Sequence, residues 1–201
     1  MKELEFEIKN VDDALDYAAK EMRLDKSYLD VEVINKKGMI IKTYICKATV
    51  KVDPAEIAFE TLETIFNTME IDANIEMRVR DNKIEYKIET DENPLLIGKG
   101  GKTLERIQYY IRNLINQFYD NHTIVQVDIG GYKANRKKQL EILATKTAKN
   151  VARSKVEARL DPMNAYERRI IHTKLADWRD VSTVSKGEGN NRHVVIKPKR
   201  R

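Results

Sequence analysis

The chain has 201 residues, of which 41% are hydrophobic and 34% are charged, so it can form two or three small domains with compact cores. It has no apolar run near the roughly 18 residues that span a bilayer, and its charged first residues lack the apolar core of a signal peptide. A single cysteine, Cys46, excludes an internal disulfide, and the three histidines lack the spacing of a metal site, so we expect a cytoplasmic protein without membrane insertion, metal or cofactor.

The net charge of +5 is unevenly distributed along the chain. Residues 130–201 hold 19 Lys and Arg against 7 Asp and Glu, whereas residues 53–129 hold 8 against 15. Residues 1–52 are balanced, with 10 of each sign. Because clustered cations attract polyanions over long distances, the carboxyl-terminal third is expected to provide most of the attraction for a nucleic acid.

The first 52 residues indicate a small β-α-β-β unit. Alternating Leu4, Phe6 and Ile8 are typical of a half-buried strand, and the apolar stripe that follows Asn10 is typical of an amphipathic helix. The predicted elements are a strand over residues 3–9, a helix over 14–22, a strand over 31–34, a turn over 35–38 and a strand over 39–52.

A second set of elements begins at the Asp53-Pro54 step, where proline suits the first turn of a helix. Apolar positions then recur alternately in the strands and at helical spacing in the helices. The predicted elements are a helix over residues 54–69, two strands within 75–89 around a turn at 81–82, a short helix over 94–97, a longer helix over 102–119 and a strand over 123–129.

Three glycines lie between the last two of these helices, in the sequence Ile-Gly-Lys-Gly-Gly-Lys-Thr at residues 97–103. Without a side chain, glycine lets the backbone approach a ligand closely, and the free N–H groups of a helix start attract anions, phosphate above all. Two lysines add positive charge. This composition indicates phosphate or nucleic acid as the ligand, and the residues expected to contact it are Gly98, Lys99, Gly100, Gly101 and Lys102.

Two kinds of phosphate-binding loop have this composition. A nucleotide-binding P-loop needs a glycine five positions before its Gly-Lys-Thr, where this chain has Leu96, and no strand leads directly into the loop. The Gly-x-x-Gly loop of a KH domain instead joins a short apolar helix to a longer amphipathic one and holds single-stranded nucleic acid. The order helix, strand, strand, helix, loop, helix, strand resembles the type II KH fold.

A long basic helix is predicted over residues 134–156. A solvated face explains any single lysine equally well, but the excess of cations over carboxylates favours contact with a polyanion. We expect Arg136 and Lys137 to take part in that contact. The packing stripe of the helix is predicted to comprise Leu140, Leu143, Ala144, Thr147, Ala148 and Val151.

Another helix is predicted after Asp161, and it carries Arg168 and His172 four residues apart on one face. Arginine offers a planar fork of donors, and histidine offers ring stacking and a donor; Arg169 extends the patch. The alternative is a structural pair that caps or bridges within the domain. A catalytic histidine is disfavoured because no nucleophile or paired carboxylate is spaced to use it.

A predicted hairpin over residues 181–187 and 192–197 completes this region, and Arg192 is a further expected RNA contact. Residues 134–199 resemble the R-three-H domain, which is named for its Arg-x-x-x-His and binds single-stranded nucleic acid. The matching residues are Pro162, Met163, Glu167, Arg168, Ile171, His172, Thr183, Ser185, Gly187, Arg192 and the strand over 194–196.

A KH domain followed by an R-three-H domain resembles the bacterial Jag family, also called SpoIIIJ-associated or KhpB/EloR proteins. Residues 36–38 match the Lys-Lys-Gly turn of its Jag-N domain, although residues 39–42 replace the usual Phe-Leu-Gly-x-Gly and the long linker common in relatives is missing. The resemblance implies an α+β chain of three small domains, at residues 1–52, 53–130 and 131–201.

The same resemblance implies a cytoplasmic RNA-binding protein in post-transcriptional control of cell elongation and division or of sporulation. It also implies a small KH-only partner protein (KhpA), contacted KH to KH; the alternatives are self-association through KH and single-stranded DNA as ligand. A protein-interaction scaffold with secondary nucleic-acid binding is the main rival, because residues 53–129 are acidic. An enzyme is not expected, because the P-loop spacing and a carboxylate cluster are lacking.

Overall fold

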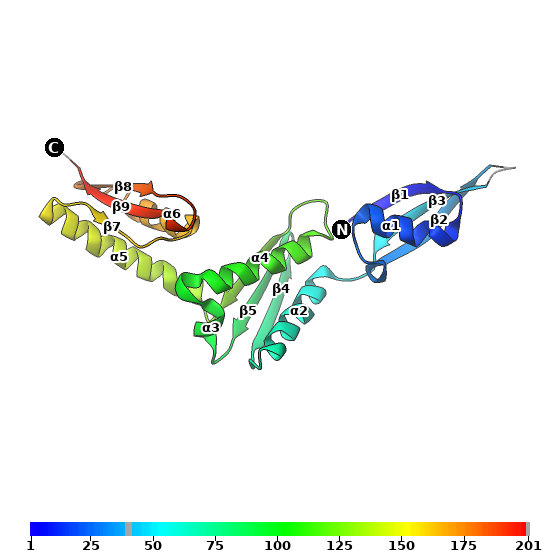
Figure 1. The fold of residues 1–201 in the computed structure, drawn as a ribbon, viewed down its shortest axis with the longest axis horizontal. Helices are drawn as coiled ribbons and strands as arrows, with labels where there is room; N and C mark the ends of the chain where they lie inside the picture. Colours follow the sequence, from blue (N-terminus) through cyan, green and yellow to red (C-terminus); the bar gives the residue numbers. More distant parts are fainter. Residues whose placement is uncertain (39–41, 200–201) are drawn as a thin grey trace. The chain divides into compact units, whose positions relative to one another are not determined.

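The computed structural model describes residues 1–38 and 42–199. It divides into two compact units, residues 1–130 and residues 131–201, which are described separately. Figure 1 shows helices and strands in both, as the predicted α+β class requires. No helix in the described part of the chain is long and apolar enough to cross a membrane.

The first half of unit 1 is the predicted β-α-β-β arrangement. A three-stranded antiparallel sheet in the order β1-β3-β2 packs against one helix, α1, and its core includes Phe6, Ala18 and Cys46. Burial raises the pKa of the Cys46 thiol, as expected for a packed cysteine. The elements are β1 (Glu3–Ile8), α1 (Ala14–Met22), β2 (Leu29–Lys37) and β3 (Thr43–Val50).

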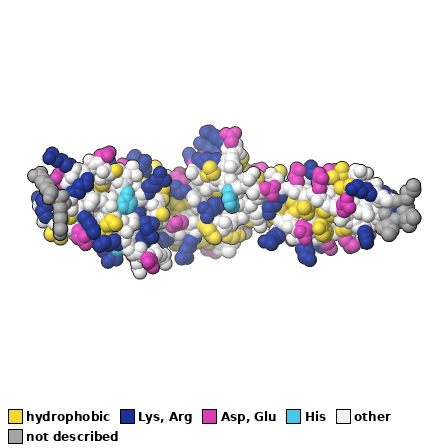
Figure 2. Space-filling model, turned by 90° about the horizontal axis from the view of Figure 1, so that it is seen from above, with side chains coloured by type: hydrophobic (Ala, Val, Ile, Leu, Met, Phe, Trp, Pro, Cys, Tyr) yellow, Lys and Arg dark blue, Asp and Glu magenta, His cyan; other side chains and the backbone are white. Residues whose placement is uncertain are grey.

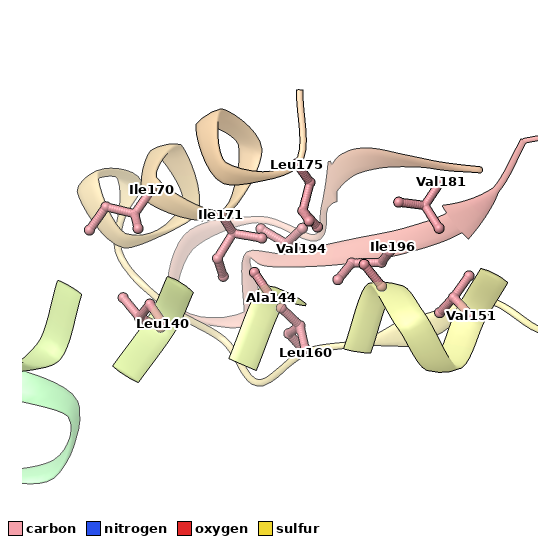
Figure 3. Close-up of a cluster of buried hydrophobic side chains, with 11 residues drawn as sticks. Leu140, Ala144, Val151, Leu160, Ile170, Ile171, Leu175, Val181, Val194 and Ile196 are labelled. Atoms are coloured by element: carbon pink, nitrogen blue, oxygen red, sulfur yellow. The ribbon is translucent and has the colours of Figure 1, made fainter. Parts of the chain in front are cut away.

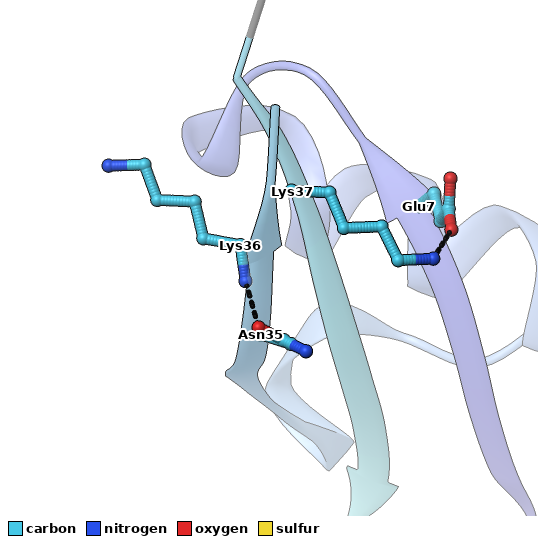
Figure 4. Close-up of polar contacts among 4 residues, drawn as sticks. All are labelled: Glu7, Asn35, Lys36 and Lys37. Carbon is cyan, nitrogen blue, oxygen red and sulfur yellow. Dashed lines mark hydrogen bonds and ion pairs between the residues drawn. The ribbon is translucent and has the colours of Figure 1, made fainter. Parts of the chain in front are cut away.

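The turn predicted over residues 35–38 is wrong for its first three residues. β2 continues through Asn35, Lys36 and Lys37, which pair with residues 43–45 of β3 after an irregularity between residues 33 and 35. Lys36 and Lys37 point to opposite sides of the strand, and Lys37 donates to Glu7 Oε1 at 2.9 Å (Figure 4). Ladder pairing outweighs the local turn preference, and the departure from the family motif at residues 39–41 lies outside the described residues.

The second half of unit 1 is the predicted KH arrangement. Its sheet has the order β4-β5-β6, with β4 antiparallel and β6 parallel to the central strand. The buried hydroxyl of Tyr86 in β5 donates to the Ala55 carbonyl of α2 at 2.8 Å, which fixes that helix against the sheet. The elements are α2 (Pro54–Thr68), β4 (Asn74–Arg80), β5 (Lys83–Glu89), α3 (Asn93–Ile97), α4 (Lys102–Asn116) and β6 (Ile124–Ile129).

The two halves of unit 1 share one hydrophobic cluster. Phe118, just beyond α4, is fully buried in the cluster that contains Phe6 and Cys46, and its ring meets Tyr28 edge-on at 5.4 Å. The amide of Lys2 also donates to the Phe118 carbonyl at 2.8 Å. The segment that follows α4 therefore contributes Phe118 to the core of the amino-terminal half.

Unit 2 packs two helices against a small antiparallel sheet in the order β7-β9-β8. Its core joins Leu140 and Ala144 of α5 to Ile171 of α6 and Val194 and Ile196 of β9 (Figure 3). The elements are α5 (Tyr132–Ser154), β7 (Ala158–Arg159), α6 (Ala165–Lys174), β8 (Val181–Lys186) and β9 (His193–Pro198).

One member of the predicted stripe on α5 does not face the core. Leu143 is 40% exposed, whereas Leu140, Ala144, Ala148 and Val151 are buried. These four follow one another at intervals of three or four residues, which keeps them on one side of the helix, and Leu143 lies beside that line. α5 also begins at Tyr132, two residues before the predicted start.

Candidate nucleic-acid interface

The glycine loop between α3 and α4 is held in shape by its own backbone. The amide of Gly98 donates to the Pro94 carbonyl at 2.9 Å, and the amide of Gly101 donates to the Gly98 carbonyl at 3.2 Å. All three glycines have positive φ, of 69°, 63° and 76° for Gly98, Gly100 and Gly101, a region that favours glycine. The loop therefore needs glycine for its backbone path.

The two sides of this loop differ in accessibility. Gly101 is buried and immediately precedes the first turn of α4, whereas Lys99, Gly100 and Lys102 are exposed. A side chain on Gly100 would meet nothing within 4 Å. The tip is thus open to a ligand, next to a helix N-terminus whose N–H groups and dipole favour an anion.

His172 is the most constrained of the predicted contacts in unit 2. Its Nδ1 lies 2.6 Å from Thr183 Oγ1 and its Nε2 lies 2.9 Å from Ser185 Oγ, so both ring nitrogens are used by hydroxyls of β8. Burial, reinforced by the positive charge of Arg168, lowers the pKa of His172. The ring therefore joins α6 to β8, and the donor expected from it is engaged within the unit.

Arg168 has a buried donor that the fold leaves unused. Among the described residues no acceptor forms a hydrogen bond with its Nε, although this atom is shielded from solvent. A buried cationic donor without a partner is costly, and because Nε is shielded, only the partly exposed remainder of the Arg168 side chain can meet a ligand. Arg169, the next residue of α6, is exposed.

Arg136 is committed to a structural ion pair. Its Nε donates to Glu167 Oε1 at 2.7 Å, and Glu167 is only 5% exposed. The pair ties the start of α5 to the start of α6, which gives a structural role to one of the residues that match the R-three-H pattern. Lys137 and Arg192 are both exposed and remain available to a ligand.

The predicted contacts are divided between the two units. Residues 98–102 lie together in unit 1, and Arg136, Lys137, Arg168, Arg169, His172 and Arg192 lie in unit 2. Two further features of the site could not be predicted from the spacing of residues in the sequence. The partners of His172 depend on a register between α6 and β8 that only the fold sets, and four lysines of α5 and α6 line a common groove.

Comparisons with known proteins agree with this geometry. A KH domain model matches residues 60–160, and an R-three-H domain model matches residues 138–198. The chain is 34% identical to the RNA-binding protein KhpB of Clostridium symbiosum over 96% of this chain and 90% of the relative. It is 33% identical to the RNA-binding protein KhpB of Bacillus subtilis, over 96% of each chain. This chain therefore belongs to the KhpB (Jag) family.

Proposed function

We propose that this chain binds single-stranded RNA at two sites, the glycine loop of unit 1 and the surface of α6 in unit 2 that is formed by Arg168 and Arg169, here called the Arg168 surface. The observation that carries the proposal is the open tip at Gly100, which lies between two exposed lysines at the start of α4. There a phosphate can approach bare amides without displacing a side chain. KH loops hold nucleic-acid backbone in this way.

The second site adds affinity through its connection to the first. Arg168 is partly exposed and lies beside the exposed Arg169, in a unit with a large excess of cations. When two weak sites lie on one chain, binding at the first raises the effective concentration of RNA at the second. Because phosphate contacts dominate such binding, its affinity falls steeply with salt.

In the cell, this protein acts as a cytoplasmic post-transcriptional regulator linked to cell elongation and division or to sporulation. This part of the proposal is supported by membership of the KhpB family. The two matched domain types, KH and R-three-H, bind nucleic acid, and we therefore assign no catalytic step to the chain. Sequencing of RNAs crosslinked to the protein in cells tests this role, and the absence of recovered transcripts would contradict it.

A protein-interaction role of the KH half is the second candidate. Tyr109 and Tyr110 of α4 are 60% and 52% exposed, next to Arg112, whose guanidinium lies 5.3 Å from the centre of the Tyr109 ring. Exposed aromatic and arginine side chains are typical of protein contacts. This surface suits a small KH-only partner of the KhpA type, or a second copy of the chain.

The direct test of RNA binding uses the full chain and labelled oligonucleotides. We expect unpaired RNA to bind more tightly than the same sequence in a duplex. Competition with single-stranded DNA measures whether the chain distinguishes RNA from DNA. The logarithm of the affinity should fall linearly with the logarithm of the salt concentration. Failure to bind unpaired RNA in dilute buffer would contradict the proposal and leave the scaffold role.

A further inference from the structure

A groove on unit 2 is lined mainly by lysines. It encloses about 510 Å³ along one side of α5, and one residue of α6 completes it. Four of its seven lining residues are lysines and only one is an acid. The lining comprises Lys138, Glu141, Ile142, Thr145, Lys146 and Lys149 of α5 and Lys174 of α6.

The lysines of this groove form no ion pairs within the described part of the chain. No carboxylate among residues 1–38 and 42–199 forms an ion pair with any of them, in contrast to Arg136, which is held by Glu167. Figure 2 shows Lys and Arg side chains interspersed with Asp and Glu side chains on the visible face. Four ammonium groups and a single carboxylate, that of Glu141, line the groove, and this excess of positive charge produces a local potential that attracts an anion.

We propose that this groove is a further contact for the phosphate backbone of single-stranded RNA, in addition to the two sites above. The inference rests on the proposed RNA-binding function. From Lys138 to Lys149 the helix rises roughly 16 Å, so the charges form a track and not a point. Lysine offers a mobile charge without a planar donor pattern, which suits phosphates whatever the base.

The composition of the groove argues against a helical protein segment as its occupant. Such a segment needs several apolar anchors at helical spacing, whereas Ile142, 68% exposed, is the only large apolar side chain in the lining. The groove also has no aromatic ring on which bases could stack. We therefore expect its contribution to be independent of RNA sequence.

The groove and the Arg168 surface lie on different sides of α6. Lys174 follows His172 by two residues, which places it about 200° further around the helix. His172 faces β8, whereas Lys174 borders the groove on α5. An RNA that contacts both the groove and the Arg168 surface must pass across α6. Only a longer RNA can therefore engage the two together.

The test compares two double variants of the full chain. K146Q/K149Q removes two charges from the groove, and R153Q/K155Q removes two exposed charges at the end of the same helix that do not line it. We expect the groove variant to bind a long unpaired RNA roughly tenfold more weakly in dilute buffer. The slope of the logarithm of the affinity against the logarithm of the salt concentration should be smaller in magnitude by about 1.4. Binding of a short RNA should change much less, and the control variant should behave like the unmodified chain.

The outcomes separate this inference from the proposed function. If the unmodified chain binds RNA and the two variants are indistinguishable, the groove proposal is wrong while RNA binding stands. If the groove variant instead loses only the capture of an acidic protein, the groove is a protein site and the proposal is equally wrong. Unchanged thermal unfolding of both variants, expected for exposed side chains, ensures that a loss of affinity reports on contact.

Discussion

The side chain of Thr103 fills the space that a side chain on Gly98 would need. A β-carbon built on Gly98 would collide with Thr103 Oγ1 and would come within 2.9 Å of its Cβ. Gly100, two residues further, faces open space although its φ is also positive. The first glycine of the loop is therefore required by packing, whereas packing places no such demand on Gly100, whose open surroundings support the proposed access of a ligand.

Replacing Gly98 by alanine should destabilise the protein. The substitution adds a clash with Thr103 to a backbone at φ 69°, and we expect a loss of about 2 kcal/mol or more in the free energy of unfolding. Gly100→Asn is the matched control, because asparagine tolerates positive φ and the space is open. Equal denaturation midpoints for the two variants would contradict this assignment.

The ion pair between Arg136 and Glu167 predicts an effect on stability. Arg136→Ala leaves the carboxylate of a residue that is 5% exposed without its partner, so unit 2 should lose about 2 kcal/mol. Adding Glu167→Gln removes the unpaired charge and should restore part of the loss. Chemical denaturation of the single and double variants measures this coupling, and strictly additive effects would argue against it.

Because Phe118 of the KH half is buried in the core of the amino-terminal half, we expect the two halves of unit 1 to unfold together. Phe118→Ala opens a cavity in the cluster that holds Phe6 and Cys46, at a cost of about 3–5 kcal/mol. The amino-terminal half should lose protection from hydrogen exchange, although the substitution lies in the KH half. Tyr110→Ala, on the exposed side of α4, is the control and should leave that protection unchanged.

The environment of His172 predicts a pH dependence of stability. Its folded pKa lies below the ordinary 6.5 because burial, and secondarily Arg168, disfavour the charged ring. Between that lowered pKa and 6.5 the unfolded chain binds a proton that the folded chain does not. The free energy of unfolding should therefore fall as pH drops below 6.5.

Histidine-to-asparagine substitution supplies the control for this pH dependence. The amide side chain does not titrate, so the H172N variant should show a flatter stability profile between pH 7 and the lowered pKa of His172, even if it is less stable throughout. The measurement is the denaturation midpoint of unit 2 across that range. Parallel profiles for the two proteins would show that another group is responsible.

Periodicity in the sequence is sufficient to predict most of the fold. The alternation in β1, β5 and β6 and the apolar stripes of α2 and α4 predict these elements correctly, because each buries one face of a regular element. Residues 35–37 are wrongly predicted as a turn because strand pairing depends on a partner distant in sequence. Leu143 is wrongly predicted in the core because neighbouring apolar residues blur the edge of a stripe.

The candidate sites are predictable to different extents. The glycine loop can be identified from adjacent residues, since its conformation is set locally by three glycines. The partners of Arg136 and His172 cannot, because Glu167, Thr183 and Ser185 meet them only after the helices and β8 pack. The lysine groove likewise requires α5 and α6 to lie side by side.

The loop at the start of α4 gives the most direct test of the whole account. K99D/G100D places two carboxylates at the exposed tip, where aspartate tolerates positive φ and meets no neighbour at position 100, so the fold should persist. The measurement is the affinity of the folded full chain for unpaired RNA in dilute buffer. We predict a loss of at least about tenfold relative to the unmodified chain; unchanged affinity would contradict the claim that this loop holds the RNA backbone.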